Sequence, residues 1–296
     1  MNALDYLQFV LAPQLFNGLT LGVAVILVAL GLTITFGLLD VLNMSHGEFY
    51  AVGAFTAVAL MAAGLGFWVV LFLAPLLMFP VAMLLERVLI RRVYDHAERH
   101  ITTLLVTFGL SLVLEDLLKL AFGPNPYRPE NPLPGMFEFG GLVLPYYRVF
   151  LVCAGSAVIA AIAWLVYRTR LGAMVRAAAF DRHMAASLGV PVGIVFSGTF
   201  AFGAALAALA GAILAPVYSV FPTMGHDFIF LAFSVVIVGG MGSVVGAVIA
   251  GLLLSQVHAL SSLIIAPVWT EAIVFGVMVA FLMLRPKGLY GGLGRA

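Results

Sequence analysis

Charged side chains are scarce in this chain. They make up 9% of its 296 residues, against about 25% in ordinary globular domains. No lysine or arginine occurs before Arg87, and only Asp227 and Glu271 are charged between Arg182 and Arg285. A helix needs about 20 apolar residues to cross a bilayer, and a charge at its centre costs roughly 2.5–3.5 kcal/mol. The composition therefore excludes a soluble domain and predicts an integral membrane protein.

Cysteine pairs and several enzyme motifs are also missing. The single cysteine, Cys153, excludes an internal disulfide. The chain has neither the G-x-S-x-G turn of serine hydrolases nor the H-E-x-x-H motif of zinc peptidases. Its only lysines are Lys119 and Lys287, so it lacks the G-x-x-x-x-G-K-[ST] phosphate-binding loop. The net charge of +1 gives no basic surface for nucleic acid. We therefore expect no enzyme, no metal site and no cofactor bound by this chain; any ATP would be hydrolysed by another chain.

Most basic residues gather in three clusters, which predict the orientation in the membrane. Cytoplasmic loops of membrane proteins carry an excess of lysine and arginine, so we place the clusters and the C-terminus in the cytoplasm. The proline-rich loop at about 123–146 is then external, and its prolines predict that it is not helical. The clusters are Arg87, Arg91, Arg92 and Arg99; Arg168, Arg170, Arg176 and Arg182; and Arg285, Lys287 and Arg295.

The apolar stretches predict an all-α protein with about eight or nine membrane-spanning helices in a single domain, residues 1–296. Nine helices would put the N-terminus outside, which suits its lack of basic residues. The expected spans lie at about 13–38, 47–64, 67–86, 101–122, 147–167, 194–216, 228–243, 245–264 and 267–284.

Two polar segments that contain glycine interrupt the apolar pattern. The first is 37–48, and the second is 222–227 with 239–243 following. Irregular backbone at membrane depth is tolerated only where protein buries it or where it lines an aqueous cavity, and transporters place substrate paths at such broken helices. The alternative for each segment is an ordinary loop at the membrane surface.

A weak internal repeat relates the two halves of the chain at an offset of 180 residues. With the expected topology one copy runs inward and the other outward, which would be an inverted repeat of the kind found in transporters. Because alanine and glycine are common here, chance is the alternative. The matched pairs are Gly18 and Gly198, Ala24 and Ala204, Gly31 and Gly211, Met44 and Met224, His46 and His226, and Met61 and Met241.

The cytoplasmic segment at about 168–193 is rich in alanine and arginine and ends in glycine and proline, a pattern typical of a short helix. One interpretation is a passive connector that lies on the lipid headgroups. The other is a protein-docking helix, in which small residues allow close approach while Arg176 and Asp181 pair with a partner.

Several segments resemble the LivH-type permease of branched-chain amino acid ABC importers, and the likeness runs from residue 17 to residue 291. The stretch from Arg176 to Gly189 is similar to the cytoplasmic coupling loop of binding-protein-dependent ABC importers. The other segments are N-G-L-T-L-G at 17–22, A-L-G-L-T at 29–33, N-M-S-H-G-E at 43–48, G-G-M-G-S at 239–243 and R-P-K-G-L-Y-G at 285–291.

The resemblance implies a permease subunit that carries leucine, isoleucine and valine across a bacterial inner membrane. The implied partners are a LivM-type permease, two ATP-consuming ATPase subunits, an external solute-binding protein and the lipid bilayer, with no nucleic acid. Arg176 and Phe180 depart from the family pattern, in which acidic residues often occupy these positions, and this leaves the partner contacts open. The residues implied in coupling to the ATPase are Gly172, Arg176, Asp181, Ala185, Leu188 and Gly189.

A zwitterionic substrate needs a path that is neither strongly charged nor wholly apolar. The polar residues at the two breaks are the candidates. They are Thr33, Thr35, Asn43, Ser45, His46 and Glu48 at the first break, and Ser234 and Ser243 at the second.

Other functions remain open on the sequence. Related permeases carry urea and short amides. A secondary transporter driven by an ion gradient would need intramembrane acids, for which Asp40, Glu48, Asp227 and Glu271 are the candidates. An intramembrane enzyme is a third class, although no complete catalytic set is visible.

Overall fold

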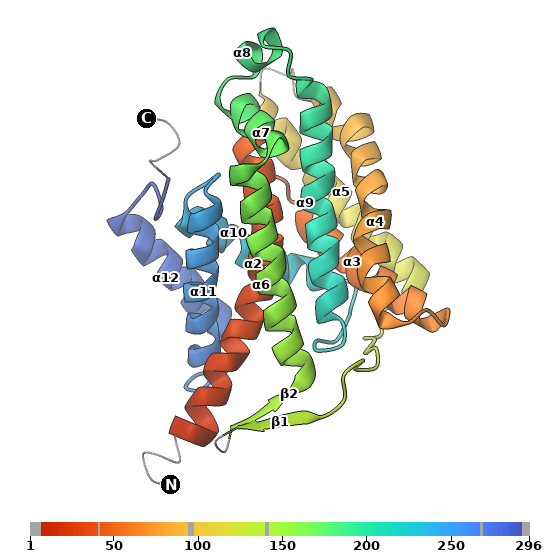
Figure 1. The fold of residues 1–296 in the computed structure, drawn as a ribbon, viewed down its shortest axis with the longest axis vertical. Helices are drawn as coiled ribbons and strands as arrows, with labels where there is room; N and C mark the ends of the chain where they lie inside the picture. Colours follow the sequence, from red (N-terminus) through yellow and green to blue (C-terminus); the bar gives the residue numbers. More distant parts are fainter. Residues whose placement is uncertain (1–6, 41, 94–97, 140–141, 267–268, 292–296) are drawn as a thin grey trace.

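The computed structural model describes residues 7–40, 42–93, 98–139, 142–266 and 269–291. It is an elongated bundle of helices with a short β-hairpin at one end (Figure 1). The elements in chain order are η1 (Leu7–Leu11), α2 (Ala12–Leu39), α3 (His46–Ala62), α4 (Phe67–Leu85), η2 (Glu86–Ile90), η3 (Arg91–Val93), α5 (Arg99–Phe122), β1 (Met136–Phe139), β2 (Leu142–Pro145), α6 (Tyr146–Arg168), α7 (Arg170–Phe180), α8 (Arg182–Ser187), α9 (Val192–Leu214), α10 (Met224–Gly239), α11 (Val244–Ser261) and α12 (Thr270–Leu284).

Each of the nine expected spans coincides with a helix, so the all-α polytopic fold is confirmed. Six helical stretches, those of α2, α4, α5, α6, α9 and α11, are long and apolar enough to cross a membrane. The helices α10 and α12 are shorter and apolar, and α3 has 17 residues. The largest shift is in α10, which begins at Met224 rather than near residue 228. One residue of the third basic cluster, Arg295, lies outside the described residues.

The helix α2 forms the centre of the bundle. Every residue from Val23 to Leu30 is at most 2% exposed. A helix that is buried on all sides needs neighbours all round, and α6, α9, α10 and α11 supply them. The core of the protein therefore surrounds α2 along its middle turns.

Helices from the two halves of the chain pack against each other, while the expected inverted repeat stays a prediction. The helix α2 packs against α9 and α11, and α9 in turn packs against α2 and α4. In Figure 1, α2 and α9 run in opposite directions. A Cβ on Gly31 would lie 2.6 Å from Gly203 O, and a Cβ on Gly203 would lie 2.8 Å from Gly31 O. The reciprocal contact allows the backbones of α2 and α9 to touch, as small residues do where membrane helices cross.

The first break and the start of α10 reach the interior of the protein, whereas Met241, in the later part of the second break, is 58% exposed. After α2 the chain turns at Asp40, which has a φ of 53°, and residues up to Ser45 lead to α3. His46 Nε2 lies 3.1 Å from Val28 O, which is about three turns before the end of α2. The helix α3 therefore begins in the middle of the bundle. The first turn of α10 lies beside it, because Gly47 packs directly on the backbone of Gly225.

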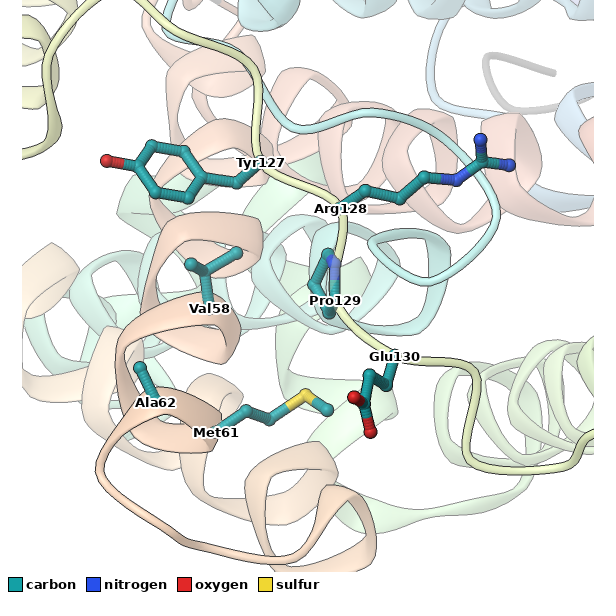
Figure 2. A pocket seen from close by; sticks show the side chains of 7 residues that line it. All are labelled: Val58, Met61, Ala62, Tyr127, Arg128, Pro129 and Glu130. Carbon is teal, nitrogen blue, oxygen red and sulfur yellow. The ribbon is translucent and has the colours of Figure 1, made fainter.

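The two ends of the bundle carry different structures. The expected external loop is not helical, as predicted, and it also forms the antiparallel hairpin of β1 and β2, which the sequence did not predict. Tyr127 in this loop exchanges two backbone hydrogen bonds of 2.8 Å with Val220, in the segment that leads into α10. Figure 2 shows a pocket of about 320 Å³ between the end of α3 and residues 127–130. The helices α7 and α8 lie at the opposite end of the bundle (Figure 1).

Candidate functional site

Three of the residues expected on a substrate path serve the backbone of their own helices. Thr35 Oγ1 donates to Gly31 O at 2.7 Å, and Ser234 Oγ donates to Phe230 O at 3.0 Å. Ser243 is the N-cap of α11, where its Oγ accepts a backbone N–H of the first turn at 3.1 Å. The hydroxyl groups of these three residues are therefore used in hydrogen bonds within their own helices.

The segment between α2 and α3 carries free polar groups inside the protein. Asn43 and Ser45 are 3% and 0% exposed. Asn43 Oδ1 accepts Ser45 N–H at 3.1 Å and Ser45 Oγ–H at 2.7 Å. Among the described residues, the Asn43 amide nitrogen and Thr33 Oγ1 are buried with no partner. Because unpaired buried donors destabilise a fold, these two groups are suited to a polar ligand.

The helix α5 presents a buried polar stripe to the first break, which the sequence analysis did not recognise. The stripe consists of Thr103, Thr107, Ser111 and Glu115, all at most 7% exposed. Their spacing of four residues places them on one face of the helix. Thr107 Oγ1 accepts Met44 N–H at 3.1 Å, so the stripe holds the segment in place. The regular spacing within an apolar helix is the signal that the sequence offered.

Glu48, Glu115 and His226 form an acid–imidazole cluster where α3, α5 and α10 meet. One ligand atom from each residue lies within 4.8 Å of the others. His226 Nε2 is 2.6 Å from Glu115 Oε2 and 3.6 Å from Glu48 Oε1. Ser111 Oγ donates to Glu48 Oε1 at 3.3 Å. Two carboxylates and an imidazole in this arrangement are a donor set for a cation.

The cluster was only partly visible in the sequence. Glu48 was a candidate for the path, whereas Glu115 was not singled out and His226 appeared only in the second break and in the repeat. The three residues come from helices that are far apart in the chain, so no local pattern joins them. His46, by contrast, is directed away toward the backbone of α2. The hydroxyl groups of Ser234 and Ser243 form hydrogen bonds with the backbone of their own helices.

At the opposite end, α7 and α8 form a compact helical turn. Gly172 lies so close to the carbonyl groups at the end of α6 that a side chain would collide with Val166 O. Arg176 Nη1 donates to the same carbonyl. The hydroxyl of Thr169 caps α7 by accepting Gly172 N–H at 3.1 Å. Arg176 therefore has a role within this chain, where the sequence analysis expected pairing with a partner.

Asp181 is likewise used inside the segment, as the N-cap of α8. Its Oδ1 accepts Met184 N–H at 2.9 Å and His183 N–H at 2.8 Å. These backbone hydrogen bonds, that of Met184 first, lower the pKa of Asp181 below its usual value. Ala185 of α8 is buried in a small apolar cluster with Ala178 of α7 and Leu38 at the end of α2. The turn therefore packs on the central helix.

Three apolar side chains of the turn project into solvent. Phe180, Met184 and Leu188 are 79%, 61% and 78% exposed. They recur every four residues, and Gly189, with a φ of 85°, ends the run. Of the three, only Leu188 was among the residues implied in coupling. Exposed apolar side chains of this size at the end of the bundle indicate an interaction surface.

Comparison with known proteins agrees with this architecture. The model of a family described as "Branched-chain amino acid transport system / permease component" matches residues 14–283. The high-affinity branched-chain amino acid transport system permease protein BraD of Pseudomonas aeruginosa is 31% identical over 296 residues, with 94% of this chain and 95% of that protein covered. LivH of Escherichia coli K12 is 30% identical over 298 residues, with 94% of each covered.

A second type of permease is also similar. LivM of Escherichia coli K12, a permease protein of the high-affinity branched-chain amino acid transport system, is 27% identical over 299 residues. The match covers 91% of this chain and 68% of LivM. The family match spans nearly every helix described above, so the chain belongs to the permease family of branched-chain amino acid transport systems.

Proposed function

We propose that this chain is the membrane-spanning subunit of an ABC importer that carries leucine, isoleucine and valine into a bacterial cell. The match of the permease family to residues 14–283 is the observation that carries the proposal. The absence of a phosphate-binding loop from the sequence assigns ATP hydrolysis to separate ATPase subunits. A LivM-type permease and an external solute-binding protein complete the assembly.

In this proposal the bundle is oriented by its charges. The turn of α7 and α8 carries arginines and faces the cytoplasm together with the C-terminus, in accord with the positive-inside rule. The hairpin and the start of α2, at the other end of the bundle in Figure 1, face outward. The pocket of Figure 2 is then open to the side on which the binding protein delivers its solute.

The substrate path passes the inner ends of α3 and α10. These two helices begin in the interior, where Gly47 and Gly225 meet, and discontinuous helices of this kind supply substrate sites in transporters. The free donors Asn43 Nδ2 and Thr33 Oγ1 and the stripe on α5 give the path its polar character. Thr35, Ser234 and Ser243 act instead as structural supports.

The turn of α7 and α8 couples the ATPases to the path. Phe180, Met184 and Leu188 insert into a groove of an ATPase subunit, and Ala185 transmits the movement to α2. Gly172 and Arg176 hold the turn against α6. Closure of the ATPases then shifts the helices that contain the path.

Gentle extraction of the tagged chain from its native membrane tests the proposed assembly. We expect two ATPase subunits and a LivM-type permease to co-purify and to be identified by mass spectrometry. A chain that purifies alone and still moves amino acids with only an ion gradient would support a secondary transporter and contradict the proposal.

A further inference from the structure

The acid–imidazole cluster has one acceptor that the protein leaves unused. Glu48 is 1% exposed, and its Oε2 has no hydrogen-bond partner among the described residues. The carboxylate packs on the first turn of α10, because a Cβ on Gly225 would lie 2.7 Å from Oε2. A buried carboxylate oxygen destabilises a protein unless a donor or a cation satisfies it. The unused acceptor therefore points to a ligand.

Charge at the cluster also favours a cationic ligand. Glu48 and Glu115 bring two carboxylates, and Lys119, which lies 2.5 Å from Glu115 Oε1, brings one ammonium. Two carboxylates therefore face one ammonium among these three side chains. Charges inside a membrane protein pair with one another or mark a substrate pathway. A ligand with a single positive charge would balance the cluster.

Lys119 shows which kind of cation fits. Its side chain ends in a primary ammonium group, the same group that an amino acid carries at its α-carbon, and Glu115 already accepts it. The lysine side chain is 42% exposed, so its ammonium can be exchanged without unfolding the helix. A primary ammonium has three donors, and the cluster offers carboxylate acceptors on two helices: Glu48 Oε2 on α3 and Glu115 on α5.

We propose that Glu48 and Glu115 bind the α-ammonium group of the transported amino acid. His226 is a positioning residue that holds the Glu115 carboxylate, and the ammonium of Lys119 competes with the substrate for the same carboxylate. The inference rests on the proposed function and names the part of the substrate that the path recognises. His226, whose side chain is 27% exposed, gives access from the solvent side. Because the ligand must displace Lys119, the site holds its substrate weakly and releases it readily.

Uptake by the complete importer tests the site. The permease pair, the ATPases and the binding protein are reconstituted in liposomes with internal ATP. The kcat/KM of leucine uptake is then measured for each variant whose complex contains the same subunits as the wild type. Glu48→Gln and Glu115→Gln each remove one charged acceptor, and a hydrogen bond to a charged group is worth roughly a 10- to 100-fold change. We expect uptake to fall by that factor. Glu271→Gln is the control, because Glu271 is an exposed carboxylate at the start of α12, outside the cluster.

Lys119→Met separates ligand binding from a structural ion pair. If Lys119 competes with substrate, its removal raises kcat/KM roughly two- to fivefold, the factor that a partly exposed ion pair is worth. If the ion pair only stabilises α5, its removal lowers uptake or leaves it unchanged, and either result overturns the proposal. Should the glutamine variants fail to assemble, the sign of the Lys119→Met effect decides alone.

Two further outcomes have distinct meanings. Glutamine variants that assemble and import leucine like the wild type would overturn the ammonium site and leave the permease function intact. A wild-type complex that imports no amino acid would overturn the proposed function, and the ammonium site with it.

Discussion

Docking by the exposed apolar residues of α7 and α8 makes a quantitative prediction. Burial of a phenylalanine or leucine side chain is worth about 1.5–3 kcal/mol. Phe180 and Leu188 are 79% and 78% exposed, so nearly all of this free energy is available to a partner. Truncation of both to alanine should remove about 2–4 kcal/mol of docking free energy, or roughly 30- to 700-fold in affinity for the ATPase.

The assay is co-purification of the ATPase with the tagged permease, followed by ATP-driven leucine uptake. We expect the double variant to insert normally, because changes at exposed positions alter stability by only about 0.5 kcal/mol, yet to lose the ATPase and the uptake. Ile194→Ala is the matched control, since Ile194 is an apolar residue that is 64% exposed just beyond the turn. Retention of the ATPase by the double variant, or equal loss in the control, would refute the docking surface.

Four other changes have expected outcomes. Gly31→Val should lower the free energy of unfolding by about 1–3 kcal/mol, because its Cβ would lie 2.6 Å from Gly203 O. Thermal unfolding measures this change, and an unchanged unfolding temperature would contradict the close approach. Glu271→Gln should leave ATP-driven uptake intact, because Glu271 is exposed, and a loss of uptake would implicate it in ion coupling. Asp181→Asn should keep the cap of α8 and Asp181→Ala should lose it, and circular dichroism and uptake assays of the two variants would show the difference. Because the pKa of Asp181 is lowered in the folded protein, its contribution to stability is complete above the usual carboxyl pKa of about 3.9 and is lost only as the pH falls below that value. Uptake that depended on the titration of Asp181 near neutral pH would contradict this. Gly189→Trp should abolish uptake while the protein still inserts, because Gly189 has a φ of 85°, and normal uptake would argue against the coupling turn.

The helices could be predicted from the sequence because a membrane-spanning helix requires a continuous run of apolar residues. Each span is an apolar run bounded by charge, glycine or proline, and the positions agree with the structure to within a few residues. The hairpin of β1 and β2 could not be predicted in this way, because strands of four residues each are too short to give a clear sequence pattern.

The depth of the first break could not be predicted from local pattern. A segment such as 42–45 has the same composition whether it lies at the membrane surface or inside the bundle. Its position is decided by distant partners: Thr107 on α5 binds Met44, and Val28 on α2 lies against His46. Only the three-dimensional packing shows that α3 begins in the interior.

The candidate site was predicted in part for the same reason. Glu48 and Asn43 stand out because polar residues are rare in apolar stretches, and the structure places both inside the protein. Thr35 and Ser234 are equally polar, but their hydroxyls bond to their own helices. Glu115 lacked a visible role until the fold brought it to His226.

The most direct measurement is leucine uptake into liposomes that contain this chain, a LivM-type permease and the ATPases, with the binding protein outside. We predict uptake that requires ATP inside and the binding protein outside, and that does not respond to a proton or sodium gradient. Uptake that continues without ATP and follows an imposed ion gradient would contradict the assignment of this chain to an ATP-driven importer.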